Sequence, residues 1–159
     1  FLEFRDWELN LLVTIVIFLY RGIKTKRYCY KVIFVTRIIL HTMISSTIQA
    51  LAEDVYMVLR AGHSESLYAR ALGVALQKKQ INYEAEKVFP LMYKDEYIGF
   101  CRPDLIIDKK IVVEIKCLGQ ISGTQRLQLL RYMRLPCITE GILINFGPQQ
   151  VDFFFCRAE

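Results

Sequence analysis

The spacing of apolar side chains predicts two helices between residues 45 and 79. Over Ser45–Arg60 the apolar residues recur every three or four positions, as on one face of an amphipathic helix. Gly62 is expected to end this helix, and Ser64 to cap a second one over Glu65–Lys79. Leucines and alanines at the same spacing give the second helix one face to bury.

After the second helix the pattern becomes that of β-strands. Four strands are expected, over Ile81–Pro90, Leu91–Phe100, Asp104–Ile107 and Ile111–Ile115. The first two are predicted to join near Pro90, and a second turn is predicted at Lys94–Asp95. The charged residues Asp108–Lys110 separate the last two strands, which are therefore expected to form a hairpin.

Helical spacing returns over Thr124–Leu135, and two further strands follow at Gly141–Asn145 and Val151–Cys156. The predicted order of elements is two helices, four strands, one helix and two strands. This order is typical of an α/β fold of the α+β mixed-sheet kind, in which helices pack on a central mixed sheet.

The first 44 residues differ from the rest and are predicted to be an extension outside a domain formed by residues 45–159. Their main apolar block, within Asn10–Tyr20, is shorter than the ~20 residues that a membrane-spanning helix needs. Because the first methionine is Met43, we interpret residues 1–42 as sequence upstream of the native start. The alternative is an interfacial membrane anchor with basic flanks.

Length and composition indicate one globular domain. A chain of 159 residues that is 53% hydrophobic can bury a core, which excludes a disordered or low-complexity protein. The net charge of +5 comes mostly from residues 1–44, where seven basic residues face three acidic ones. The remaining residues are nearly neutral, with 14 basic and 13 acidic side chains, so charge alone gives little support for nucleic-acid binding.

Five cysteines are spaced widely along the chain, and no Cys-x-x-Cys pair is present. Neither histidine stands at ligand spacing from a cysteine, which argues against a zinc site. An odd number of cysteines near apolar runs is typical of free thiols, so a reducing, cytoplasmic setting is expected.

Charged residues at the ends of two predicted strands are the main candidates for chemistry. Glu114 and Lys116 lie two apart, so both point to one face of their strand while Ile115 points to the other. A hairpin around Asp108–Lys110 would bring Asp104 near Glu114. A divalent cation relieves the repulsion of two such carboxylates, and Mg²⁺ prefers oxygen ligands of this kind. Such a cation acidifies water for attack on a phosphodiester, while a lysine neutralises the developing charge.

A purely structural interpretation stands beside this one. Asp104 would then cap a turn, and Glu114 and Lys116 would form an ion pair that binds nothing. The spacing of these residues does not choose between the two interpretations.

Four sequence motifs bear on that choice. Pro103-Asp104, nine residues, and then Glu114-Ile115-Lys116 resemble the signature of the PD-(D/E)XK nuclease superfamily. The other three are Gly62–Tyr68, Gln128–Tyr132 and Ile142–Gly147, which resemble the GxxExxY, QxxxY and LINFG motifs of its GxxExxY branch. The resemblance extends from about Ser45 to Phe155 and implies a restriction-endonuclease-like core.

The resemblance also implies roles for individual residues. Asp104 and Glu114 would be metal ligands together with the backbone carbonyl of Ile115. Glu65 would hold a metal-bound water or a second ion. Lys116 would position or activate the water and stabilise the phosphate, and Gln128 would orient the substrate or Lys116. The implied metal is Mg²⁺, with Mn²⁺ as a substitute. Gly62, Tyr68 and Tyr132 are interpreted as structural.

The implied function is that of a metal-dependent nuclease, an endonuclease that hydrolyses phosphodiester bonds in DNA in preference to RNA. Nucleases of this fold often act as dimers, so a homodimer is one expected assembly. The alternative is a module that keeps the nuclease fold and binds nucleic acid or protein without cleaving anything.

Overall fold

The computed structural model describes residues 26–158, with side chains from Met43 onward. The chain divides into two compact units, residues 1–47 and 48–159, and the second contains every strand. The apolar block that we predicted within residues 10–20 lies outside the described residues. Among the helices that are described, none combines the length and apolar character needed to cross a bilayer.

The first described helix is longer than predicted. Helix α2 spans Lys26–Leu59, whereas the sequence pattern indicated a start at Ser45. Neither proline nor glycine occurs between Gly22 and Gly62, so nothing in the sequence stops the helix from extending toward the N-terminus. Helix α3 spans Glu65–Lys78, one residue shorter than expected.

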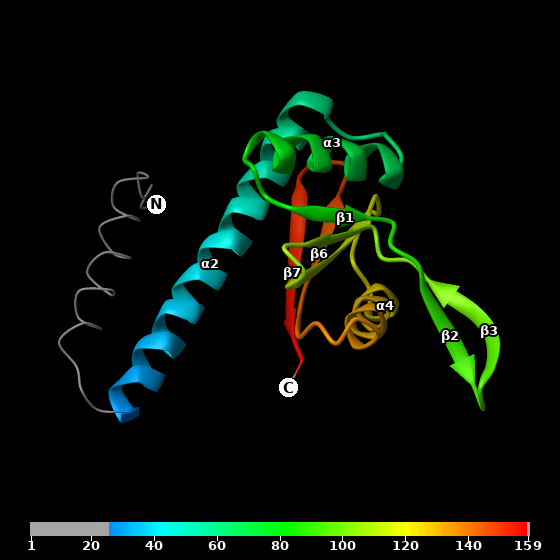
Figure 1. The fold of residues 1–159 in the computed structure, drawn as a ribbon. Coiled ribbons are helices and arrows are strands. Elements are labelled where there is room, and N and C mark those ends of the chain that lie inside the picture. Colours follow the sequence, from blue (N-terminus) through cyan, green and yellow to red (C-terminus); the bar gives the residue numbers. More distant parts are fainter. Residues whose placement is uncertain (1–25, 159) are drawn as a thin grey trace. The chain divides into compact units, whose positions relative to one another are not determined.

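The larger of two sheets has five strands in the order β1-β4-β5-β6-β7. Their bounds are Tyr83–Ala85 (β1), Leu105–Ile107 (β4), Ile111–Lys116 (β5), Glu140–Phe146 (β6) and Val151–Arg157 (β7). Strands β5 and β6 run parallel and all other neighbours run antiparallel. The predicted mixed sheet with helices packed on it is therefore confirmed (Figure 1).

The two strands predicted over residues 81–100 are wrong in number and position. The chain forms three strands there: β1 and the two-stranded ribbon of β2 (Phe89–Tyr93) and β3 (Glu96–Cys101). Pro90 lies inside β2 rather than in a turn, which a ribbon with two free edges permits because proline lacks an N–H. The predicted turn at Lys94–Asp95 is confirmed, and both residues have positive φ, as in a tight hairpin.

Each face of the sheet has its own packing partners. Helix α4 (Gly123–Arg134) buries Leu129 and Met133 against β5 and β6. The core cluster on this face is Ile106, Val112, Leu129, Met133, Ile138 and Leu143. Because side chains alternate along a strand, Glu114 and Lys116 share the α4 face with Val112. On the opposite face α3 packs against β5 and β1.

Candidate active site

The β4–β5 hairpin brings Asp104 to the end of β5. Leu105 pairs with Val113 in this antiparallel hairpin, so Asp104 and Glu114 are next in register just beyond the end of β4. Since β4 begins only at Leu105, no β4 backbone group pairs with β5 beyond Val113. The backbone N–H of Ile115 donates to Asp104 Oδ2 across 2.6 Å, which fixes the Asp104 carboxylate against the strand.

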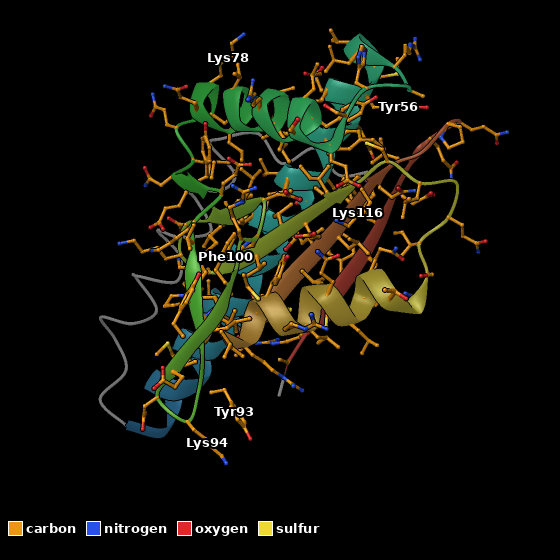
Figure 2. All side chains as sticks on the ribbon, turned by 90° about the vertical axis from the view of Figure 1, so that its right-hand side faces the viewer. Tyr56, Lys78, Tyr93, Lys94, Phe100 and Lys116 are labelled. Atoms are coloured by element: carbon orange, nitrogen blue, oxygen red, sulfur yellow. The ribbon has the colours of Figure 1, made fainter. Side chains whose placement is uncertain are left out.

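Glu114 and Lys116 form a buried ion pair on the same strand. Lys116 Nζ donates to Glu114 Oε1 at 2.7 Å, and the Glu114 side chain is only 3% exposed. Figure 2 shows Lys116 on the end of its strand, between α3 and α4. Removing two charges from water costs free energy, and the attraction between them in an otherwise Ile and Val strand does little more than offset this cost. The pair is therefore not explained by a contribution to stability.

Glu65 reaches the same lysine from the other side of the sheet. It is the first residue of α3, and its Oε2 atom lies 3.6 Å from Lys116 Nζ. The Glu65 side chain is partly exposed, so it can also face an incoming ligand. Lys116 thus bridges two carboxylates that come from distant parts of the sequence.

The electrostatics of the cluster favour binding a cation. Burial, followed by repulsion from Asp104, raises the pKa of Glu114 to about 7, although Lys116 acts in the opposite direction. Burial also raises the pKa of Asp104, against the Ile115 hydrogen bond. Burial alone would lower the pKa of Lys116, but its hydrogen bond to Glu114 and the surrounding carboxylates raise it overall. The ionised forms of Asp104 and Glu114 are thus unfavourable in free energy, and a bound cation would stabilise them.

One atom of this cluster has no partner within the protein. Glu114 Oε2 is buried and makes no hydrogen bond, which is rare for a charged oxygen. A cation shared with Asp104 fits this atom, because Mg²⁺ needs only one or two carboxylates and keeps several waters. No group of three or more His, Cys, Asp or Glu side chains in the described part of the chain is placed to hold a metal.

Gln128 is held by its own helix. Its amide nitrogen donates to the Tyr132 hydroxyl, four residues later on α4, at 3.1 Å. Tyr132 is partly buried against the core cluster, in agreement with a structural role. The described hydrogen bonds therefore join Gln128 to Tyr132 rather than to Glu65, Asp104, Glu114 or Lys116.

Two of the motifs meet in the core behind the site. Tyr68 is fully buried, stacks on Phe146 with ring centroids 4.2 Å apart, and donates a hydrogen bond to the Arg60 carbonyl. Tyr56 donates to the Gly147 carbonyl at 3.1 Å. Ser64 occupies the N-cap position of α3, but its side chain makes no capping bond there. Tyr68 therefore anchors the helix that begins with Glu65.

Asn145 is a residue of the site that the sequence analysis did not single out. It is fully buried, lies beside Lys116 in the register of β5 and β6, and bonds Leu118 in both directions. Asn145 Nδ2 donates to the Leu118 carbonyl at 2.9 Å, and the Leu118 N–H donates to Asn145 Oδ1 at 2.8 Å. The available signal was the position of Asn145, a polar residue directly between Ile144 and Phe146 in an otherwise apolar part of the strand.

Comparison with known proteins identifies what this arrangement is similar to. A family profile described as the PD-(D/E)XK nuclease superfamily matches residues 42–154. The crystal structure of SSO0001 is 24% identical with a TM-score of 0.48, over 58% of this chain and 48% of that one. An alkaline exonuclease from Laribacter hongkongensis is 10% identical with a TM-score of 0.41, over 72% of this chain and 82% of that one. No curated protein matches.

Proposed function

This chain belongs to the PD-(D/E)XK nuclease superfamily, and from that premise we propose that it hydrolyses nucleic-acid phosphodiester bonds with the help of Mg²⁺ or Mn²⁺. The observation that carries the proposal is the buried Glu114 carboxylate, with one oxygen on Lys116 and the other without a partner. Buried polar atoms in folded proteins normally have a hydrogen-bond partner. The unpartnered Glu114 oxygen and the adjacent Asp104 carboxylate suit a bound cation.

Each side chain has a defined task in this proposal. Asp104, Glu114 and the Ile115 carbonyl would hold the metal, which when bound supplies an acidified water and positive charge for the phosphate. Lys116 keeps its proton because carboxylates surround it, so it stabilises charge that develops on the phosphate. Glu65 contacts the Lys116 ammonium and would hold a metal-bound water or a second ion. Gln128 would contact the substrate or Lys116 after leaving Tyr132.

We further propose membership of the GxxExxY branch, because the Gly62–Tyr68 and Ile142–Gly147 motifs pack together through Tyr68 and Phe146. Within this proposal the enzyme is a cytoplasmic endonuclease that prefers DNA and acts as a homodimer. Residues 45–159 form the nuclease domain, and residues 1–44 are an extension outside it.

The test is nicking of a supercoiled plasmid by the chain in Mg²⁺, in Mn²⁺ and in EDTA. Nicking is expected with either metal and not in EDTA. Lys116→Ala and Glu114→Gln are each expected to lower the rate by a factor of about 10² or more, as for other charge-stabilising groups. Lys78→Ala and Asp54→Asn, which change exposed residues of α3 and α2, are matched controls expected to keep full activity.

The alternative is that the fold binds nucleic acid or protein without cleaving it. It would be favoured if the folded chain nicked neither DNA nor RNA and bound neither metal. Metal binding without DNA cleavage, combined with cleavage of RNA, would keep the nuclease and change its substrate.

A further inference from the structure

The ribbon of β2 and β3 has many large apolar side chains that are exposed and not packed against the rest of the domain. In and beside it, six such side chains are between 55% and 64% exposed: Val88, Met92, Tyr93, Tyr97, Ile98 and Phe100. Figure 1 shows the ribbon extending away from the five-stranded sheet. Exposed apolar surface of this extent usually marks a binding site.

A β-bulge gathers part of this surface on one face of the ribbon. Met92 pairs with Tyr97, Pro90 pairs with Phe100, and directly paired residues point to the same side. Tyr97 and Phe100 are three residues apart and would face opposite sides in a regular strand. The register shift at Met92 leaves one extra residue in β3, at Ile98, and so places both rings on one side. We call Pro90, Met92, Tyr97 and Phe100 the ribbon face.

Glycine makes this bulge possible. Gly99, beside the extra residue, has φ of +150°, a conformation that residues with a side chain rarely adopt. The other side of the ribbon is used within the domain at the end near α4, where Phe89 packs against the α4 core cluster and its partner Cys101 is buried, and of its large apolar side chains only Tyr93, beside the turn, is exposed. The ribbon face is therefore the side left for another molecule.

The ribbon leads directly to the candidate active site. Strand β3 ends at Cys101, and only Arg102 and Pro103 separate it from Asp104. Arg102 is exposed at this end, whereas at the opposite end the exposed Lys94 stands in the turn beside two exposed acidic residues, Asp95 and Glu96. The Lys94 ammonium lies 5.4 Å from the centroid of the Tyr93 ring. In Figure 2, Tyr93 and Lys94 mark the end of the ribbon away from the domain, and Phe100 lies nearer to it.

We propose that the ribbon face stacks on unpaired nucleobases, so that the substrate is a nucleic acid with a single-stranded segment beside the cleaved bond. This inference rests on the proposed nuclease function. Tyr97 and Phe100 offer flat apolar surfaces for bases, while Arg102, between the ribbon and Asp104, offers a cation for a phosphate, the combination that single-strand binding proteins use. A strand of five or six residues is ~17–20 Å long, enough to contact a few nucleotides.

This chemistry favours nucleic acid over a second copy of the chain as the occupant. Paired bases hide their faces in the helix stack, whereas unpaired bases expose them, so the ribbon face distinguishes the two substrates. A second copy would give no reason for the direct connection of the aromatic surface to Arg102 and Asp104.

The test measures binding by the full chain carrying Lys116→Ala, in EDTA, so that no cleavage occurs. The probes are a fluorescein-labelled 20-nucleotide single-stranded DNA and a blunt 20-base-pair duplex, followed by fluorescence anisotropy. The single strand is expected to bind at least tenfold more tightly. Tyr97→Ala and Phe100→Ala are each expected to weaken single-strand binding roughly tenfold, and Tyr97→Phe should retain it. Leu127→Ala, which removes an exposed apolar side chain from α4, is the matched control.

Two further readouts identify stacking as the cause. A 2-aminopurine base in the single strand is expected to be quenched on binding, and the quenching should be lost in Phe100→Ala. The dependence of affinity on salt should stay unchanged in the ring variants and become weaker in Arg102→Ala, since only the latter removes a phosphate contact.

Unchanged affinity in both ring variants, or equal affinity for duplex and single strand, would overturn the inference. So would a change from dimer to monomer in the ring variants, measured by light scattering, without a change in DNA affinity, because a second copy would then occupy the face. Absence of any DNA binding also rejects it. The nuclease proposal is tested separately: it fails if the unmodified chain, with Lys116 intact, shows no metal-dependent nicking.

Discussion

At the scale of single residues, Glu114 is the clearest departure from what folding alone would select. Its carboxylate is buried beside Asp104, and burial raises its pKa to about 7. A folded-state pKa above the ordinary value means that the folded chain binds a proton more readily than the unfolded chain. Ionised Glu114 therefore destabilises the metal-free fold above pH 7, and protonation relieves this between about pH 7 and pH 4.5.

We accordingly predict that Glu114→Gln stabilises the metal-free protein at pH 8 and that the gain fades as the pH falls toward 5. The shift in pKa corresponds to an upper bound of about 3 kcal/mol in the free energy of unfolding. Urea denaturation in EDTA at pH 5, 6, 7 and 8 measures it, with Asp54→Asn as the control. A constant difference between Glu114→Gln and the unmodified chain across this range would contradict the prediction.

Asn145 provides a second prediction at this scale. Asn145→Ala removes both hydrogen bonds to Leu118 and leaves partly buried backbone groups unsatisfied. We expect a loss of roughly 2–4 kcal/mol in the free energy of unfolding, together with reduced nicking, since the segment after Lys116 loses its anchor. Asn82→Ala, at an exposed position, should have little effect. Denaturation and plasmid nicking, measured on the same samples, check both parts.

At the scale of elements, serine at the N-cap position of a helix forms a capping bond in one of two cases. Ser122 caps α4 in a reciprocal arrangement with Gln125, whereas Ser64 has no capping bond at the start of α3. We predict that Ser122→Ala costs about 1 kcal/mol in the free energy of unfolding and Ser64→Ala only a few tenths. Thermal melts of the two variants provide the comparison, and equal losses would disprove it.

The elements also show which parts of the fold were predictable. The β4–β5 hairpin and α4 carry strong periodicity and a charged turn, and the structure confirms them within one residue. The ribbon was missed because Pro90 was interpreted as a break, although a free strand edge tolerates proline. A bulge at Ile98 also disrupts the alternation on which strand prediction depends.

At the scale of the whole molecule, metal binding and folding are expected to be linked. A cation that binds only the folded site at ten times its dissociation constant stabilises by about 1.4 kcal/mol. We predict that Mg²⁺ or Mn²⁺ raises the melting temperature by several degrees relative to EDTA, and that Asp104→Asn abolishes this rise. Scanning calorimetry with Ca²⁺ and Na⁺ as comparison ions measures the effect. An equal rise in Asp104→Asn would place the metal elsewhere.

The candidate site was only partly visible in the sequence for a physical reason. Asp104 and Glu114 are joined by a local hairpin, so their approach follows from spacing. The contact of Glu65 with Lys116 depends on how α3 docks, and the bonds of Asn145 to Leu118 depend on parallel pairing of β5 with β6. Contacts between residues far apart in the sequence do not produce a periodic pattern of apolar residues, so this pattern could not predict them.

The position of β5 in the sheet has a consequence for synthesis of the protein. Its parallel partner β6 begins at Glu140, after the whole of α4, and supplies Asn145 beside Lys116. While the ribosome is still making α4, the nascent chain already carries Glu65, Asp104, Glu114 and Lys116 but lacks β6, the parallel partner of the strand with Glu114 and Lys116. The order of translation therefore leaves the β5–β6 pairing, and with it the contact of Lys116 with its neighbour Asn145 in the sheet, to form only after β6 has emerged.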